Sequence, residues 1–141
     1  MASWKFKLDQ ELTHETVAEP APAFDHAWLS IEPIDGAVRL RVRAGYAWDG
    51  CTWAPDLSGT RFASCLHDAI YQFAEPIAAA SGWSVRAVLR WGDRIFKERM
   101  RADGAARWVV WLYTLAVRLL GYAYHQAARW WRAHWRARNC F

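Results

Sequence analysis

The sequence predicts an α+β fold, with an N-terminal antiparallel β-hairpin or small sheet packed beside three C-terminal helices, the last long and rich in Trp and Arg. Two observations predict it. Apolar residues alternate with polar ones before residue 60, as in strands, and recur every three or four positions after it, as in helices. A chain of 141 residues that is 54% hydrophobic can bury one core. We therefore expect one domain over 1–141, β-rich over 1–56 and helical over 57–141.

The strand prediction depends on the stretch WLSIEPIDGAVRLRVRAGYAW, residues 28–48. Val38, Leu40 and Val42 alternate there with three arginines, which is typical of a strand with one buried face. Asp35-Gly36 separates this strand from the apolar run before it, and that dipeptide between two such runs predicts a β-hairpin. The N-terminal stretch WKFKLDQELTHETV supplies one or two more strands, and AEPAPAF, with its two prolines, forms a connecting loop.

Two helices of moderate length are predicted after residue 60. The first is ended by Pro76. Its apolar residues lie three or four positions apart: Phe62, Leu66, Ile70 and Phe73. The second begins at Ser84 as its N-cap and continues to about Arg101. Its inward side is formed by four apolar residues: Val88, Trp91, Ile95 and Phe96.

The third predicted helix runs from about Ala105 to beyond Arg132. Its first half, WVVWLYTLAVRLLGYAY, is apolar nearly all round. A span this short is at the lower limit for crossing a bilayer, and the arginine inside it would cost about 2.5–3.5 kcal/mol there. We therefore predict a buried core helix. Four of its apolar residues should be largely buried: Trp108, Trp111, Leu115 and Leu119.

The C-terminal segment YHQAARWWRAHWRARNCF is basic and aromatic. One predicted face carries Trp130, Trp131, His134 and Trp135, and a second stripe carries Arg129, Arg132 and Arg136. A solvated helix face is the common explanation, and the alternatives are an anionic membrane surface, a partner groove or the N-terminal strands. We expect the Trp cluster to be covered by this domain or by a neighbouring subunit. No recognisable nucleic-acid-binding module is present, so nucleic acid is not a predicted partner.

The cysteines and the N-terminus indicate a reducing compartment. Cys51, Cys65 and Cys140 are odd in number and lack C-x-x-C spacing, which favours neither a disulfide framework nor a zinc site. The N-terminal MASWKFKLDQ has charged residues where a signal peptide needs an apolar centre.

The stretch CLHDAIYQ, residues 65–72, contains the candidate site. His67 and Asp68 are adjacent in an otherwise apolar segment, and Tyr71 follows one helical turn after the histidine. Burying ionisable groups costs on the order of several kcal/mol unless they are paired, hydrogen-bonded or bound to a metal. The next helix supplies Asp93 near its inner boundary. If the two helices run antiparallel, His67 and Asp93 should lie within hydrogen-bond reach.

A loop rich in Gly, Asp and aromatic residues, AGYAWDGCTWAPD at residues 44–56, precedes these helices. Two uses of the arrangement remain open. A histidine oriented by Asp93 can act as general base on a water, while Asp68 and loop carbonyls hold a hard divalent cation such as calcium. The other use is a buried network of His67, Asp93 and Tyr71 that fixes how two helices and a loop meet.

Four short motifs in a fixed order resemble the domain of unknown function 1353 family, small proteins of tailed phages and prophages. They are DG-x-x-x-A-P from Asp49, HD-x-x-Y from His67, D-x-x-F from Asp93 and AVRLLG ending at Gly121. The similarity covers about residues 38–121 and departs from the family at 51–54 and in the Arg/Trp-rich tail. It implies a phage or prophage origin and a small α+β domain, without a settled activity.

HD-x-x-Y on one helix, with a Gly-containing loop before it and an aspartate on the next helix, also resembles the secreted phospholipase A2 group, which has viral members. By this resemblance His67 would be the base for water attack, Asp93 would orient it, and Tyr71 would support them. Asp68 would bind calcium. The loop would complete the metal site through three further residues: Tyr46, Asp49 and Gly50.

The expected function is that of a phage or prophage structural or assembly protein, associated with the virion or tail and made in the bacterial host cytoplasm. Its predicted partners are other phage structural proteins or its own copies, bound through the C-terminal helix, with contact to a membrane surface as an alternative. The alternative function is a phage-encoded hydrolase of phospholipase A2 type that acts on the host envelope.

Overall fold

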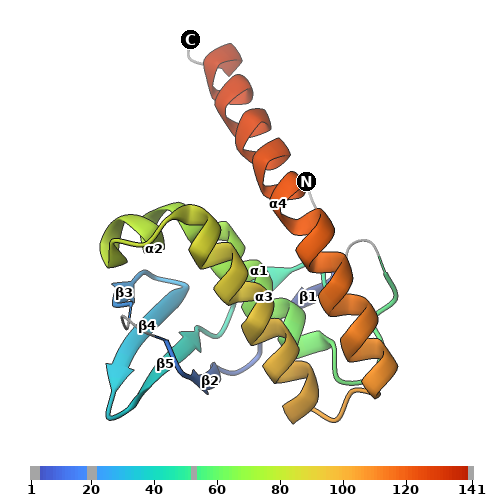
Figure 1. The fold of residues 1–141 in the computed structure, drawn as a ribbon. Helices are drawn as coiled ribbons and strands as arrows, with labels where there is room; N and C mark the ends of the chain where they lie inside the picture. The colour runs from blue at the N-terminus through green and yellow to red at the C-terminus, as the bar shows by residue number, and fades with distance from the viewer. Residues whose placement is uncertain (1–3, 19–21, 52–53, 140–141) are drawn as a thin grey trace.

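The computed structural model describes residues 4–18, 22–51 and 54–139, with side chains up to Trp130. Over these residues the chain has the predicted α+β fold: antiparallel strands from the N-terminal part lie beside helices from the C-terminal part (Figure 1). The last helix passes along the helical side, and its C-terminal end extends beyond the rest of the fold (Figure 1).

The larger sheet has four described strands in the antiparallel order β2-β5-β4-β3. They are β2 (Leu12–Thr16), β3 (Phe24–Asp25), β4 (Leu29–Ile34) and β5 (Ala37–Val42). The predicted hairpin is confirmed as β4–β5, and Gly36 in its turn adopts a φ of 70°, which other residues rarely do. The predicted loop AEPAPAF lies partly outside the described residues, and its last residue begins β3.

A second ladder lies within the segment that the sequence predicts as irregular. β1 (Phe6–Lys7) pairs with β6 (Ala47–Trp48), so the loop of residues 44–56 contains a short strand. The rings of Phe6 and Trp48 are 5.4 Å apart, and Trp48 is buried. A contact between residues so distant in the chain has no local sequence signal.

The alternation in β5 separates a buried face from a charged one. Val38, Leu40 and Val42 are fully buried, as predicted. On the outer face Arg39 is 2.8 Å from Glu15 of β2, and Arg41 is 3.3 Å from Glu32 of β4. Such exposed pairs contribute only about 0–1 kcal/mol each, so the buried face supplies most of the stability of this sheet.

Four helices, rather than the predicted three, are present among the described residues: α1 (Arg61–Gln72), α2 (Ala74–Ser81), α3 (Val85–Ala102) and α4 (Arg107–Asn139). The prediction that Pro76 ends a helix is wrong, because Pro76 lies in the first turn of α2. Proline is tolerated there since the backbone N–H groups of the first turn have no partner within the helix. The predicted N-cap Ser84 is confirmed, and its hydroxyl accepts from the Ala87 N–H at 3.1 Å.

The main core lies between the larger sheet and helices α1, α2 and α3. Leu66, Ile70 and Phe73 are buried as predicted, whereas Phe62 is exposed. The inward residues predicted for α3 are all buried: Val88, Trp91, Ile95 and Phe96. A second cluster joins the end of α3 to the start of α4 and includes Met100 and Tyr113.

The burial predicted for the outer side of α4 is wrong. The exposed fractions are 62% for Trp108, 67% for Trp111, 40% for Leu115 and 68% for Leu119. The buried side of α4 is instead formed by Val110, Thr114, Val117, Gly121 and His125. α4 packs against α3 along one side of the fold, so only one face of an almost wholly apolar helix is covered (Figure 1). Trp130 is also exposed, and the other predicted members of the Trp and Arg stripes after residue 130 lie outside the described side chains.

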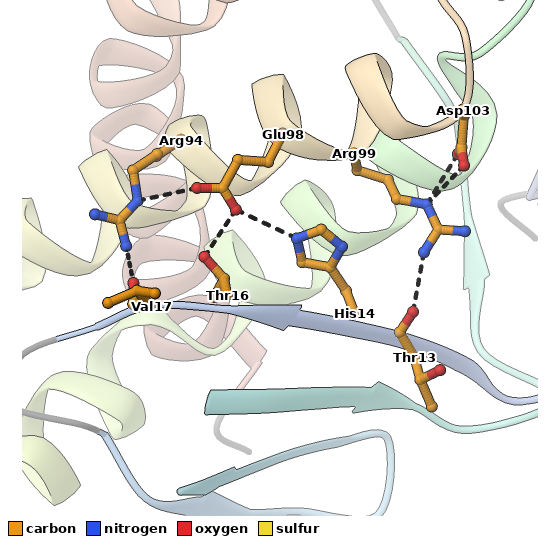
Figure 2. Close-up of polar contacts among 8 residues, drawn as sticks. All are labelled: Thr13, His14, Thr16, Val17, Arg94, Glu98, Arg99 and Asp103. Carbon is orange, nitrogen blue, oxygen red and sulfur yellow. Dashed lines mark hydrogen bonds and ion pairs between the residues drawn. The ribbon is translucent and has the colours of Figure 1, made fainter. Parts of the chain in front are cut away.

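Polar side chains of α3 hold the edge strand β2, a contact that the sequence did not predict (Figure 2). Arg99 donates to the Thr13 carbonyl at 2.9 Å, and Arg94 donates to the Val17 carbonyl. Glu98 accepts from the Thr16 hydroxyl at 2.7 Å and lies 3.4 Å from His14 Nε2. The Thr13 carbonyl of the edge strand and the Val17 carbonyl just after it are thereby paired, which covers part of an edge that could otherwise pair with another chain.

The described cysteines, Cys51 and Cys65, are buried free thiols. Burial raises the pKa of Cys51 to about 11 and raises the pKa of Cys65 further, so neither thiol is a nucleophile near neutral pH. Cys140 lies outside the described residues. No described helix is both long enough and apolar enough to span a membrane.

Candidate functional site

The predicted contact between His67 and Asp93 is confirmed. His67 Nε2 lies 3.0 Å from Asp93 Oδ1, across the interface between α1 and α3. The Tyr71 hydroxyl donates to the same Oδ1 at 2.7 Å. His67 and Tyr71 are one turn apart on α1, and their ring centroids are 4.0 Å apart. Both side chains therefore reach Asp93 from one face of α1.

Two glycines allow α3 and α4 to pack closely against α1 beside this contact. A Cβ on Gly92 of α3 would lie 3.1 Å from Ile70 Cγ2 and 3.4 Å from the Tyr71 ring. A Cβ on Gly121 of α4 would lie only 2.5 Å from the Tyr71 hydroxyl oxygen. Glycine inside a helix costs about 1 kcal/mol relative to alanine, so its presence twice beside one tyrosine indicates a packing requirement.

His67 is buried between two carboxylates. Burial alone would lower the pKa of His67, but Asp68 and Asp93 outweigh it and raise the pKa above its ordinary value of 6.5. The second ring nitrogen, Nδ1, is 3.6 Å from Asp68 Oδ1, too long for a hydrogen bond but close for an ion pair. The protonated imidazole is therefore stabilised, with both N–H groups directed at carboxylates.

The two remaining groups of the site differ in their access to water. Burial, followed by the nearby Asp93 carboxylate, raises the pKa of Tyr71, so its phenol stays a neutral donor. Asp68 lies at the edge of the site that faces solvent, and its side chain is 36% exposed. Burial raises the pKa of Asp68, His67 opposes that effect, and the charge of Asp49 adds to it. The structure therefore brings the predicted loop residue Asp49 into the electrostatic neighbourhood of Asp68.

The loop of residues 44–56 is fixed to α1 on both sides of the site. The Tyr46 hydroxyl donates to Gln72 at 3.0 Å, and the Trp48 indole N–H donates to the Ser64 hydroxyl at 3.1 Å. The Tyr46 carbonyl, predicted as a metal ligand, already accepts from the Leu8 N–H at 2.9 Å. Nothing in the sequence predicts these contacts of Gln72 and Ser64, except that the two residues lie on either side of the HD-x-x-Y motif.

The predicted calcium ligands are only partly assembled. Gly50 is buried with a φ of 71°, and a Cβ there would meet the Asp56 carboxylate at 2.4 Å. That carboxylate accepts from the Cys51 N–H at 3.0 Å. Calcium takes six to eight oxygen ligands, and within the described ranges no three His, Cys, Asp or Glu side chains form a group that could hold a metal ion. A site here would depend on Asp68, Asp49 and backbone carbonyls, and calcium binding stays a prediction.

Comparison of the chain with family models, curated proteins and solved structures found no match. The resemblances to the domain of unknown function 1353 family and to phospholipase A2 therefore remain predictions that rest on the motifs quoted above.

Proposed function

We propose that this chain is a phage or prophage structural or assembly protein, associated with the virion or tail, in which His67, Asp93 and Tyr71 act as an internal clamp. The observation that carries the clamp is the convergence of two donors, from His67 and Tyr71, on one buried oxygen of Asp93. Hydrogen bonds to a charged group contribute about 1.5–3 kcal/mol each. The network is therefore a strong link between α1 and α3.

The raised pKa of His67 favours a clamp over a base. A general base must be unprotonated at the working pH, whereas the two carboxylates stabilise the protonated ring. The role in assembly is supported by the resemblance to the phage family, since three of its motifs contain His67, Asp93 and Gly121, which the structure brings together around Tyr71.

The clamp is tested by the variant Asp68→Asn, with Asp9→Asn at an exposed position as the matched control. Asp68 lies 3.6 Å from His67 Nδ1 with its side chain 36% exposed, so solvent screens the pair and its loss should cost about 1 kcal/mol or less. Calcium should not change the melting temperature of the parent protein. A parent that is stabilised by millimolar calcium, through a site that Asp68→Asn removes while the fold stays intact, would contradict the clamp.

The assembly role is tested by purifying particles from an induced host and measuring this chain by mass spectrometry, with an abundant host protein as the contamination control. We expect the chain to co-purify with particles or with tail intermediates. Complete infective particles after deletion of the gene, together with its absence from purified particles, would refute the proposal.

A hydrolase of phospholipase A2 type is the second candidate, and one observation favours it. Asp93 holds His67 Nε2, which leaves Nδ1 on the side of Asp68, whose carboxylate is partly open to solvent. A ring oriented in this way can take a proton from water once it is unprotonated. The test is hydrolysis of micellar phospholipid above neutral pH with calcium present. In this case His67→Gln should lose activity at least a hundredfold, whereas His26→Gln, at an exposed histidine, should retain it.

A further inference from the structure

We propose that the groove between α3 and α4, together with the outer face of α4, docks the protein on an anionic membrane surface. Lipid phosphate groups occupy the groove, and the exposed apolar side chains of α4 enter the headgroup region. This inference is independent of the role of His67 and depends on a different face of the molecule.

The groove between α3 and α4 is basic. It has a volume of about 520 Å³, and four of its lining residues are cations: Lys97, Arg101, Arg107 and Arg118. Arg107 and Arg118 are eleven residues apart, about three helical turns, so they lie on the same side of α4. Among the described residues, none of the four cations has an ion-pair partner, and no acidic residue lines the groove. Unpaired like charges around one hollow attract an anion.

A buried hydroxyl also lines this groove. The residue is Thr114, which is only 6% exposed, and its Oγ1 makes no hydrogen bond to any described group. Buried polar groups are normally paired, so an unpaired donor here indicates a missing acceptor. The oxygen is shielded from solvent in this structure, so the four cations are the main phosphate contacts and a hydrogen bond from Thr114 requires its side chain to rotate toward the groove.

The surface beside the groove is apolar. Five exposed residues follow helical spacing and form one stripe on α4: Trp108, Trp111, Leu112, Leu115 and Leu119. Trp111 and Leu115 also line the groove, so the basic and apolar regions are continuous. Leu and Trp beside Arg and Lys are the composition of helices that lie in a membrane interface, where the cationic side chains reach the phosphate level.

A phospholipid surface fits this combination better than the two other candidates. A symmetric contact between two copies through α4 would bring two basic grooves together, and α4 carries no acidic residue that could neutralise them. Nucleic acid would pair with the cations and stack on Trp108 or Trp111, but the leucines of the same stripe offer it neither stacking nor hydrogen bonding: Leu112, Leu115 and Leu119. An anionic lipid supplies both a phosphate and an apolar layer.

The test is co-sedimentation with vesicles of phosphatidylcholine, with and without phosphatidylglycerol. We expect the parent to bind the anionic vesicles and to be released by salt. Lys97→Gln with Arg101→Gln should weaken binding about 25-fold, about fivefold for each basic residue removed. The matched control is Lys7→Gln with Arg90→Gln, which removes the same charges from exposed positions outside the groove and should bind nearly as the parent does.

The apolar contribution is tested by Trp111→Ser against Trp4→Ser, since both residues are exposed by more than half. Only Trp111→Ser should reduce binding. Four outcomes would overturn the proposal: no binding to anionic vesicles, equal binding to neutral ones, equal binding by the groove variant and its control, or equal loss in the two Trp variants. A dimer that Trp111→Ser dissociates, or groove-dependent binding of duplex DNA, with no vesicle binding in either case, would assign the surface to that partner instead.

Discussion

Replacing Asp93 with asparagine tests the central feature of the site, because it removes a charge and keeps the shape. Asp93 is buried and accepts from His67 Nε2 at 3.0 Å and from the Tyr71 hydroxyl at 2.7 Å. Breaking a buried ion pair by removing one partner costs about 3–5 kcal/mol. The amide oxygen of Asp93→Asn still accepts one hydrogen bond, so we expect a loss near the lower limit, about 3 kcal/mol, where His67 is protonated.

The loss should depend on pH in a defined direction. The pKa of His67 is raised above 6.5 in the folded chain, so folding favours the protonated ring. The stability that this provides is fully present below pH 6.5 and is lost as the pH rises through the folded pKa. Asp93→Asn lowers that pKa. Its cost in unfolding free energy should therefore shrink to about 1 kcal/mol, the value of an ordinary hydrogen bond, in alkaline solution.

Urea unfolding of the parent and Asp93→Asn over a range of pH measures this difference, with Asp9→Asn as the exposed control. The titration of His67 is read separately by NMR. A cost that is the same at every pH, or a His67 pKa that does not fall in the variant, would refute the ion pair as the origin of the stabilisation.

Three further predictions concern packing, the edge strand and a helix cap. Gly121→Ala should destabilise by about 1–3 kcal/mol in thermal melts, because its Cβ would lie 2.5 Å from the Tyr71 oxygen, and adding Tyr71→Phe should recover part of that loss. Burial lowers the pKa of His14 and Glu98 opposes this, so Glu98→Gln should lower it further in an NMR titration. Ser84→Ala should cost about 1 kcal/mol in urea unfolding, and an unchanged midpoint would exclude the capping bond.

Local pattern was sufficient for the β4–β5 hairpin and for the histidine site. The alternation around Val38 fixes which face of β5 is buried, because side chains in a strand point to opposite faces in turn. His67 and Tyr71 share a face of α1 because they are four residues apart. Asp93 could be predicted as their partner because a charged side chain at the inner boundary of an amphipathic helix requires a partner.

Contacts between distant segments could not be predicted in this way. His14 and Glu98 are 84 residues apart, and the β1–β6 ladder joins the N-terminus to the site loop. Neither contact has a periodic signal, because each depends on how complete elements come together. The helix that contains Pro76 was missed for a related reason: the same residue can end one helix or occupy the first turn of the next.

The amino-acid pattern shows which residues of α4 are apolar, whereas packing in the folded chain selects which of them are buried. A helix that is apolar nearly all round has no preferred inward face in its pattern. Gly121 allows one face of α4 to pack closely against Tyr71, whereas Trp111 and Leu119 on the other face remain mostly exposed. Burial depends on which elements surround a side chain, and these are fixed only when the whole chain has folded.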